Sequence, residues 1–323
     1  MFYKVILLLL PGLTLIALNS VNFLGCSSDP VSPIETVKFS RDILPIFAQN
    51  CNFPGCHNSF DKSDGIDLTS WNSLMFQGSN IGPLVIPYNA WWSNLVQHIN
   101  RDTNIAPVVT PYMPKAQLPY TNGSPLPQNI VMLIMRWINE GAKNDNGEVA
   151  FSNITRKAFI SNQASDYIAV VNLDNNFLVR LVDVGGRNNQ TQPLDVPHHV
   201  TVDNQGRYFY PALIAEGYLE KLDAVTYEKV GRLFLGSAPA EIFLLSNGTK
   251  GYVTNWDASG LERNVKFIDT QNMTVLDTIS DIRMKATHGA RITHDDNYLI
   301  VISQLSEYIL VIRTSDNQIE DAV

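Results

Sequence analysis

Two cysteines and a histidine lie within seven residues of one another in this chain. Cys51 and Cys56 are separated by four residues, and His57 follows the second cysteine directly. Two thiols this close can form a disulfide or attach a prosthetic group covalently, and a neighbouring imidazole can ligate a metal. The segment is therefore the first candidate for chemistry.

The order of these three residues favours covalent attachment of a haem. The ordinary c-type attachment signal has two cysteines two residues apart, followed by His. Each thiol forms a thioether with one vinyl group of the haem, and the His is the proximal iron ligand. Here Pro54 and Gly55 lie in the longer gap, and we expect the two extra residues to bulge out. The alternative is a Cys51–Cys56 disulfide without haem.

Helical spacing of apolar residues predicts the elements around this segment. We expect short helices over residues 39–47, 68–78 and 89–99, with Ser40 as the first N-cap. The clearest helix covers residues 128–141 and ends at Gly141. Its apolar face consists of Ile130, Leu133, Ile134, Trp137 and Ile138.

This order of elements resembles the small bacterial c-type cytochrome domains. The resemblance covers residues 38–148 and rests on the Ile-Leu-Pro-Ile-Phe, Gly-Cys-His, Met-Pro and Trp-Ile sequences in that order. It implies an all-α domain holding one covalent haem c. Cys51 and Cys56 would be the attachment points, His57 the proximal ligand and Met113 the distal ligand. Met75 and His98 are the alternative distal ligands.

The N-terminus predicts export. Lys4 precedes an apolar run over residues 5–18, which has the length of a signal-peptide core and is short for a membrane span. Leu24-Gly25-Cys26 resembles the lipobox of bacterial lipoproteins. That resemblance implies a signal peptide at 1–25, lipidation of Cys26 and a tether at 26–37 that is rich in Ser and Pro. We therefore expect a lipid-anchored protein in the periplasm, at the outer membrane or on the cell surface.

Short β-branched and aromatic runs recur in the second half of the chain. Aligned runs begin near residues 158, 208, 251 and 298, at intervals of 50, 43 and 47 residues. Periods of this length are typical of β-propeller blades. The run Tyr252-Val253-Thr254-Asn255 resembles the YVTN propeller repeats. We expect an all-β propeller over residues 155–323, with about four blades and therefore partial, truncated or completed by another chain.

Two histidines occupy matching places in this repeat. His198 and His288 align just before the expected innermost strands, whereas the blade between them has Glu241 and no histidine. The architecture resembles cytochrome-cd-type nitrite reductases and nitrous oxide reductases, in which propeller histidines serve a second haem or copper. The resemblance implies a metal or haem in the channel at His198 and His288. The alternative is that both histidines form structural hydrogen bonds.

The whole sequence thus predicts an all-α cytochrome domain followed by an all-β propeller. A net charge of −8 argues against nucleic acid as a partner. We expect a membrane-anchored electron-transfer protein whose propeller docks redox partner proteins or binds a substrate or a second cofactor. The rival functions are a redox enzyme with its centre in the propeller channel and a haem-free surface binding protein.

Overall fold

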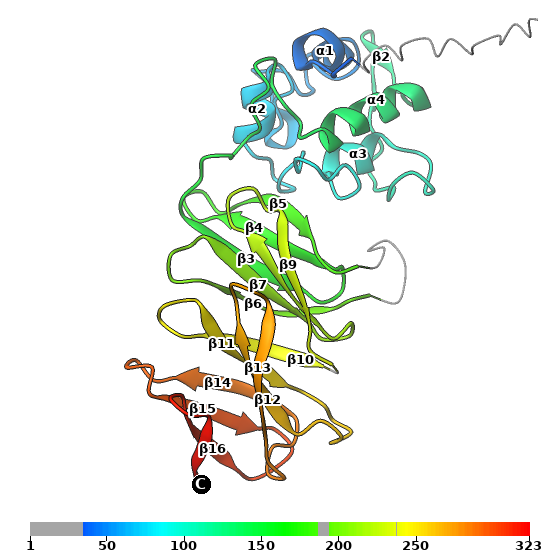
Figure 1. Ribbon diagram of the computed structural model, residues 1–323. Helices are drawn as coiled ribbons and strands as arrows, with labels where there is room; N and C mark the ends of the chain where they lie inside the picture. The colour runs from blue at the N-terminus through cyan, green and yellow to red at the C-terminus, as the bar shows by residue number, and fades with distance from the viewer. Residues whose placement is uncertain (1–34, 187–193, 237) are drawn as a thin grey trace, which may run out of the picture. The chain divides into compact units, whose positions relative to one another are not determined.

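The computed structural model describes residues 35–186, 194–236 and 238–323, and this part of the chain is mostly β. It contains seventeen strands in five sheets, and its helices are few and short (Figure 1). The expected fold class, an all-α cytochrome domain followed by an all-β propeller, is therefore wrong. The described residues before 157 contain a β-ribbon and long loops as well as helices, whereas from residue 157 onward the chain is all-β.

The N-terminal region is built from short elements. They are the π-helical turn η1 Phe39–Ile43, α1 Leu44–Asn50, the 3-10 turn η2 Ser63–Gly65, α2 Trp71–Phe76, α3 Asn94–Ile99, the ribbon strands β1 Ala116–Gln117 and β2 Thr121–Asn122, and α4 Gln128–Asn139. Two of the expected helices are shorter than their apolar spacing suggested. The Ser93 hydroxyl donates to the carbonyl of Asn89 and so closes a turn where α3 was expected to have begun.

Capping explains where the other helices start. In α2, Ser70 and Ser73 form a reciprocal capping box. The expected capping role of Ser40 is wrong, because Ser40 lies inside η1 and bonds Asp145. The helix expected at 128–141 matches α4, which ends at Asn139 and is followed by Gly141 at a φ of +106°.

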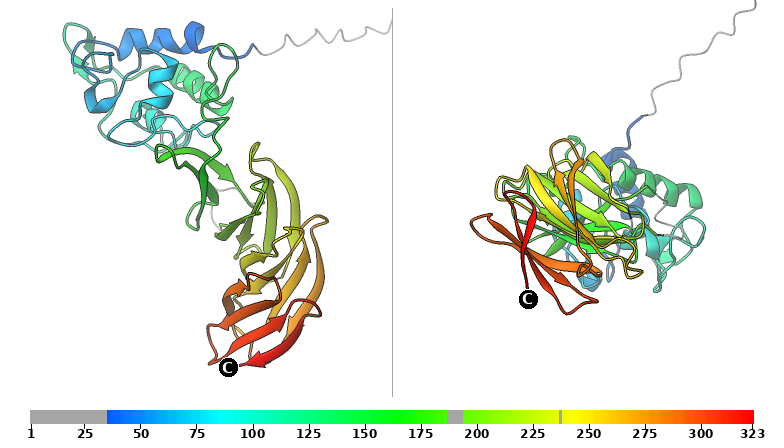
Figure 2. Two further views of the ribbon diagram at one scale, coloured as in Figure 1. Left: turned by 90° about the vertical axis from the view of Figure 1, so that its left-hand side faces the viewer. Right: turned by 60° about the horizontal axis from the view of Figure 1, so that its bottom comes forward.

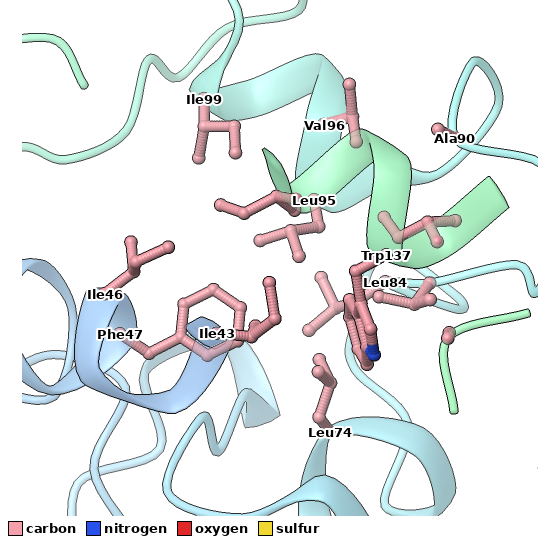
Figure 3. Close-up of a cluster of buried hydrophobic side chains, with 14 of the residues drawn as sticks. Ile43, Ile46, Phe47, Leu74, Leu84, Ala90, Leu95, Val96, Ile99 and Trp137 are labelled. Carbon is pink, nitrogen blue, oxygen red and sulfur yellow. The ribbon is translucent and has the colours of Figure 1, made fainter. Parts of the chain in front are cut away.

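One apolar cluster holds these short helices together. Figure 3 shows Phe47 of α1, Leu95 of α3 and Trp137 of α4 among the side chains of this cluster. Trp137 is buried, and its indole N–H donates to the carbonyl oxygen of Lys143 at 2.9 Å. Since helices of six or seven residues are not stable alone, this packing is what maintains them.

Four antiparallel sheets follow one another from residue 157. The first is β3 Lys157–Asn162, β4 Tyr167–Asn172 and β5 Phe177–Asp183; the second is β6 Pro197–Val202, β7 Tyr208–Leu213, β8 Tyr218–Asp223 and β9 Lys229–Phe234; the third is β10 Pro239–Leu244, β11 Lys250–Asn255, β12 Asn264–Asp269 and β13 Thr274–Ser280; the fourth is β14 Thr287–Ile292, β15 Tyr298–Ser303, β16 Ile309–Arg313 and β17 Gln318–Ala322. Their order can be followed by colour in Figure 2.

Each sheet shares buried apolar side chains with the next. Three buried clusters span neighbouring sheets: one contains Val170 and Phe209, the next Tyr210 and Val253, and the last Tyr252 and Val301. The aligned runs near residues 208, 251 and 298 are β7, β11 and β15, which are the second strands of their sheets. The true first strands, β6, β10 and β14, lie beside one another. Successive side chains of a strand point to opposite faces of its sheet, so an apolar strand can pack against the neighbouring sheet on each side.

Membrane association is not visible in the described residues. None of their helices has both the length and the apolar character needed to cross a bilayer. Cys26 and the expected signal peptide lie outside the described residues.

Candidate functional site

The two cysteines flank a closed turn that follows α1. The amide of Cys56 donates to the carbonyl of Phe53 at 3.0 Å, and Gly55 has a φ of +77°. Proline at the second position and a positive-φ glycine at the third are typical of a type II turn. The amide of Gly55 also donates to the carboxylate of Asp61 at 2.8 Å. The four-residue gap is thus occupied by a compact turn.

The turn brings the second cysteine and the histidine back towards the first cysteine. The main-chain amide of His57 donates to the carbonyl of Cys51 at 3.1 Å. Both cysteines are free thiols. Burial, together with the nearby Cys56, raises the pKa of the Cys51 thiol to about 12, and burial followed by Asp61 raises the pKa of Cys56. Both side chains therefore keep their thiol hydrogens at neutral pH.

His57 is held in one tautomer by its surroundings. The imidazole is buried, and its Nδ1 lies 3.2 Å from the carbonyl oxygen of Ser63. A carbonyl can only accept, so Nδ1 carries the proton and Nε2 keeps its lone pair. Burial lowers the pKa of His57 despite the opposing effect of the hydrogen bond that the imidazole donates to the Ser63 carbonyl. His57 is thus a neutral imidazole with one nitrogen available as a ligand.

Met113 comes from a distant part of the sequence and is fixed against α3. Its main-chain amide donates to the carbonyl of His98 at 2.9 Å. The guanidinium of Arg101 donates to the carbonyls of Met113 at 2.8 Å and His98 at 2.9 Å. Nδ1 of His98 lies 2.8 Å from the carbonyl oxygen of Pro111. The loop that carries Met113 is therefore tied to the end of α3 at several points.

These side chains line two hollows with shared walls. The larger has a volume of about 300 Å³ and is bordered by Cys51, His57, Asp64, Ile66, Leu68, Ile81, Leu84, Leu95, His98, Ile99, Pro111, Met113 and Lys115. The smaller, of about 130 Å³, again has Cys51, His57 and Met113 in its wall and adds Cys56. The structure thus brings together all four residues that were expected to hold the haem.

The two alternative distal ligands differ in position. His98 lines the larger hollow. Met75 is buried in the apolar cluster of the helices and is not among the lining residues of either hollow. Met113 and His98 thus both line the larger hollow, whereas the position of Met75 is that of an ordinary core residue.

A haem is compatible with this donor set. Paired thiols, a neutral buried imidazole and a thioether are the groups that attach and ligate a c-type haem. Most of the other lining residues of the larger hollow are apolar, which suits a porphyrin ring. Its exposed charged residues are Asp64 and Lys115.

The two histidines of the sheet region also meet, and they bring an unexpected third residue. Nε2 of His198 lies 2.8 Å from Nε2 of His288, and Nδ1 of His288 lies 3.1 Å from the carboxylate of Glu241. Both histidines lie within strands, β6 and β14, and do not precede them. The sequence alignment placed Glu241 one residue past the position of the two histidines, opposite His199, so an acidic residue beside that position was the available signal.

The described residues contain no group of three or more His, Cys, Asp or Glu side chains arranged to hold a metal ion.

The sequence analysis did not identify Arg101, which holds the Met113 loop. A single arginine in a polar loop gives no sequence signal, since its role depends on carbonyl groups that only folding brings together.

Comparisons with known proteins add little. No protein-family model matches the chain, and no curated protein matches it. A solved structure of hydrazine synthase from Kuenenia stuttgartiensis is similar over 52% of this chain, with 18% sequence identity and a TM-score of 0.46. The match spans 46% of that chain, about half its length. A likeness this slight supports no conclusion about function, which has to be argued from the site itself.

Proposed function

We propose that this protein binds one haem c at Cys51, Cys56 and His57 and carries single electrons in an exported, membrane-anchored form. The observation that supports the proposal is the meeting of both cysteines, His57 and Met113 at two hollows with shared walls. The chance meeting of two thiols, a neutral imidazole and a thioether in an apolar site is a poor alternative, because each belongs to the known ligand chemistry of c-type haem.

Each side chain would have one task. The Cys51 and Cys56 thiols would hold the haem through thioether bonds to its two vinyl groups. His57 would ligate through Nε2, while the carbonyl of Ser63 keeps the proton on Nδ1. Met113 would ligate from the opposite loop, held by Arg101. When bound, a haem supplies an iron that alternates between ferrous and ferric states.

The apolar walls of the larger hollow would influence the reduction potential of a haem bound there. Ile66, Leu68, Leu84, Leu95 and Ile99 border the larger hollow, and all five are buried. Excluding water disfavours the more highly charged oxidation state, and a thioether ligand raises the potential further. These residues would therefore position the haem and exclude water from it.

Besides the docking expected on the sheets, a redox partner would contact the ribbon β1–β2, beside the proposed haem site. Leu118 is 79% exposed and Tyr120 is 49% exposed, and both belong to the turn of the ribbon. Gln117, in the same ribbon, lines the smaller hollow. Exposed apolar side chains next to a cofactor site are suited to brief protein contacts. Lipidation at Cys26 would keep the protein at a membrane surface where such partners meet.

Covalent haem attachment can be tested directly. The chain should be produced together with a cytochrome maturation system, denatured, and measured by pyridine haemochrome spectroscopy and intact mass. We expect a mass gain of one haem that survives denaturation. Cys56→Ser and Cys51→Ser should each weaken or abolish covalent retention, whereas Cys26→Ser, the matched cysteine control, should leave it unchanged.

Two other outcomes would support the rival functions. A chain that gains no haem and is two hydrogens lighter, with Cys51 joined to Cys56, would be a haem-free binding protein. A second chromophore or bound copper that is lost in His198→Gln would indicate a redox centre among the sheets.

A further inference from the structure

A β-bulge occurs at the same place in the first strand of three successive sheets. The register shifts fall between Pro197 and His199 in β6, between Pro239 and Ile242 in β10, and between Thr287 and Ala290 in β14. These strands lie beside one another. A bulge turns a side chain away from its regular direction. His198, Glu241 and His288 lie within the three bulges, which explains how residues of three sheets come into contact.

These residues form a hydrogen-bonded chain with a fourth member. The amide nitrogen of Gln163 lies 2.7 Å from Nδ1 of His198. Nε2 of His198 lies 2.8 Å from Nε2 of His288. Nδ1 of His288 lies 3.1 Å from Oε1 of Glu241. Gln163 is in the turn between β3 and β4, so the chain joins all four sheets.

Only one distribution of protons satisfies every contact when both imidazoles are neutral. The Glu241 carboxylate can only accept, so His288 must carry its proton on Nδ1. Its Nε2 is then an acceptor, and His198 must donate from Nε2. Nδ1 of His198 in turn accepts from the Gln163 amide. Every donor is matched with an acceptor, and the chain runs in one direction from Gln163 to Glu241.

Acidification disrupts this arrangement in two steps. One added proton can be accommodated, because the amide of Gln163 can rotate to present its oxygen to His198. The shared Nε2–H then joins an imidazolium to an imidazole, and Glu241 balances the charge. A second proton leaves two N–H groups and two positive charges facing each other at 2.8 Å. The histidines must then separate.

The surrounding groups act in the same direction. His199 of β6 has its Nε2 4.0 Å from the carboxylate of Glu241, so this one carboxylate faces two imidazoles, those of His288 and His199. Arg291 of β14 contributes a further positive charge near His199. The His288 side chain is 27% exposed and that of Glu241 is 17% exposed, so protons from solvent can reach the cluster.

We propose that the pair His198–His288, bridged to Glu241, is an acid-sensitive latch that fastens the first strands of three sheets together. It is closed at neutral pH and opens when both imidazoles are protonated. The latch is independent of the haem proposal, because none of its members lines the hollows around Cys51 and His57.

The first test is a direct measurement of the tautomers. Nitrogen NMR of the imidazoles in the full chain at pH 7.5 should find the proton on Nδ1 of His288 and on Nε2 of His198. On acidification the pair should titrate in two separated steps. Glu241→Gln keeps an acceptor for His288 but removes the charge, and should shift both steps to lower pH. The reverse tautomers, or two independent titrations unchanged in Glu241→Gln, would overturn the proposal.

The second test is stability. Between pH 7.5 and 5.0 the folding equilibrium constant of the wild type should fall about tenfold more than that of His288→Gln. A protonation that the folded state disfavours by about one pKa unit changes this constant about tenfold. His294→Gln is the matched control, because His294 is exposed in the β14–β15 turn and the variant should keep the wild-type profile. If His288→Gln and the wild type have the same pH profile, there is no latch.

Discussion

The main-chain amide of Met113 donates to the carbonyl oxygen of His98 at 2.9 Å, so the loop that carries the proposed distal ligand is bonded to the end of α3. Arg101 strengthens this link, since its guanidinium reaches the carbonyls of both residues and lies 4.5 Å from the centre of the Tyr112 ring. Ligand position in this site therefore depends on a residue that would not touch the haem.

Arg101→Gln should release the loop. Losing hydrogen bonds from a charged group to partly buried carbonyls should lower the free energy of unfolding by about 1–3 kcal/mol, measured by urea denaturation. In haem-loaded protein, partial loss of the Met113 ligand should also lower the reduction potential.

Arg156→Gln is the matched control for this prediction. Arg156 forms an exposed ion pair with Asp174, with side chains 70% and 54% exposed. Exposed pairs contribute about 0–1 kcal/mol. Equal losses in the two variants would show that Arg101 has no special role in holding the loop.

Gly55→Ala should distort the turn between the cysteines. Its positive φ costs an L-residue about 1–2 kcal/mol. A Cβ there would also lie 3.2 Å from the Gln117 amide nitrogen, which donates to Pro54. Gly147→Ala has a similar φ of +84° with open space around it.

The difference between the two glycine variants isolates the contact with the ribbon. Gly55→Ala should be the more destabilising by about 0.5–1.5 kcal/mol, the contribution of one hydrogen bond, and should reduce the yield of covalent haem. If Gly147→Ala reduces that yield equally, backbone strain near the cysteines is irrelevant to attachment.

The pH dependence of stability should include a contribution from His57. Burial lowers its pKa in the folded protein below the ordinary value of 6.5. The folded state therefore binds this proton less readily than the unfolded chain, so stability is complete above pH 6.5 and decreases as the pH falls below it. Thermal unfolding of the haem-free protein between pH 8 and 5 should show this decrease, and His57→Gln should reduce it. An unchanged slope in His57→Gln would contradict the prediction.

The amphipathic helix α4 offers a matched pair of truncations. Ile134 is fully buried and Met132 is 48% exposed. Ile134→Ala should cost about 2–5 kcal/mol because it leaves a cavity, whereas Met132→Ala should cost no more than about 0.5 kcal/mol. Chemical denaturation measures both. A comparable cost for Met132→Ala would mean that this face of α4 is covered in solution.

Much of the site could be predicted from the sequence because its signals are local. Cys51, Cys56 and His57 lie close together in the chain, and the recurring β-branched and aromatic runs coincide with one strand in each of the four sheets, at 157–162, 208–213, 250–255 and 298–303. The all-α prediction failed for a physical reason. Apolar spacing around residues 68–78 and 89–99 allows helices, but Ser70 and Ser93 start them late, and tertiary packing decided their lengths.

The relationships that were missed depend on contacts between distant residues. The alignment matched His198 with His288 but could not show that the register shifts bring Glu241, one residue past the matching position, to the same place. Likewise, nothing in the local sequence tells Arg101 apart from an ordinary surface arginine. Such contacts are properties of the packed structure, since they join residues 12 to 90 positions apart.

The turn between the cysteines contains the two residues by which this spacing exceeds the ordinary haem-attachment signal. Pro54 and Gly55 are exposed at its tip, and their removal would leave Cys-Asn-Phe-Cys-His. Loop tips of this kind gain and lose residues readily. A maturation enzyme that measures the distance between the thiols along the chain would therefore distinguish this chain from one with the ordinary spacing, whereas an enzyme that responds only to the folded positions of the two thiols would not.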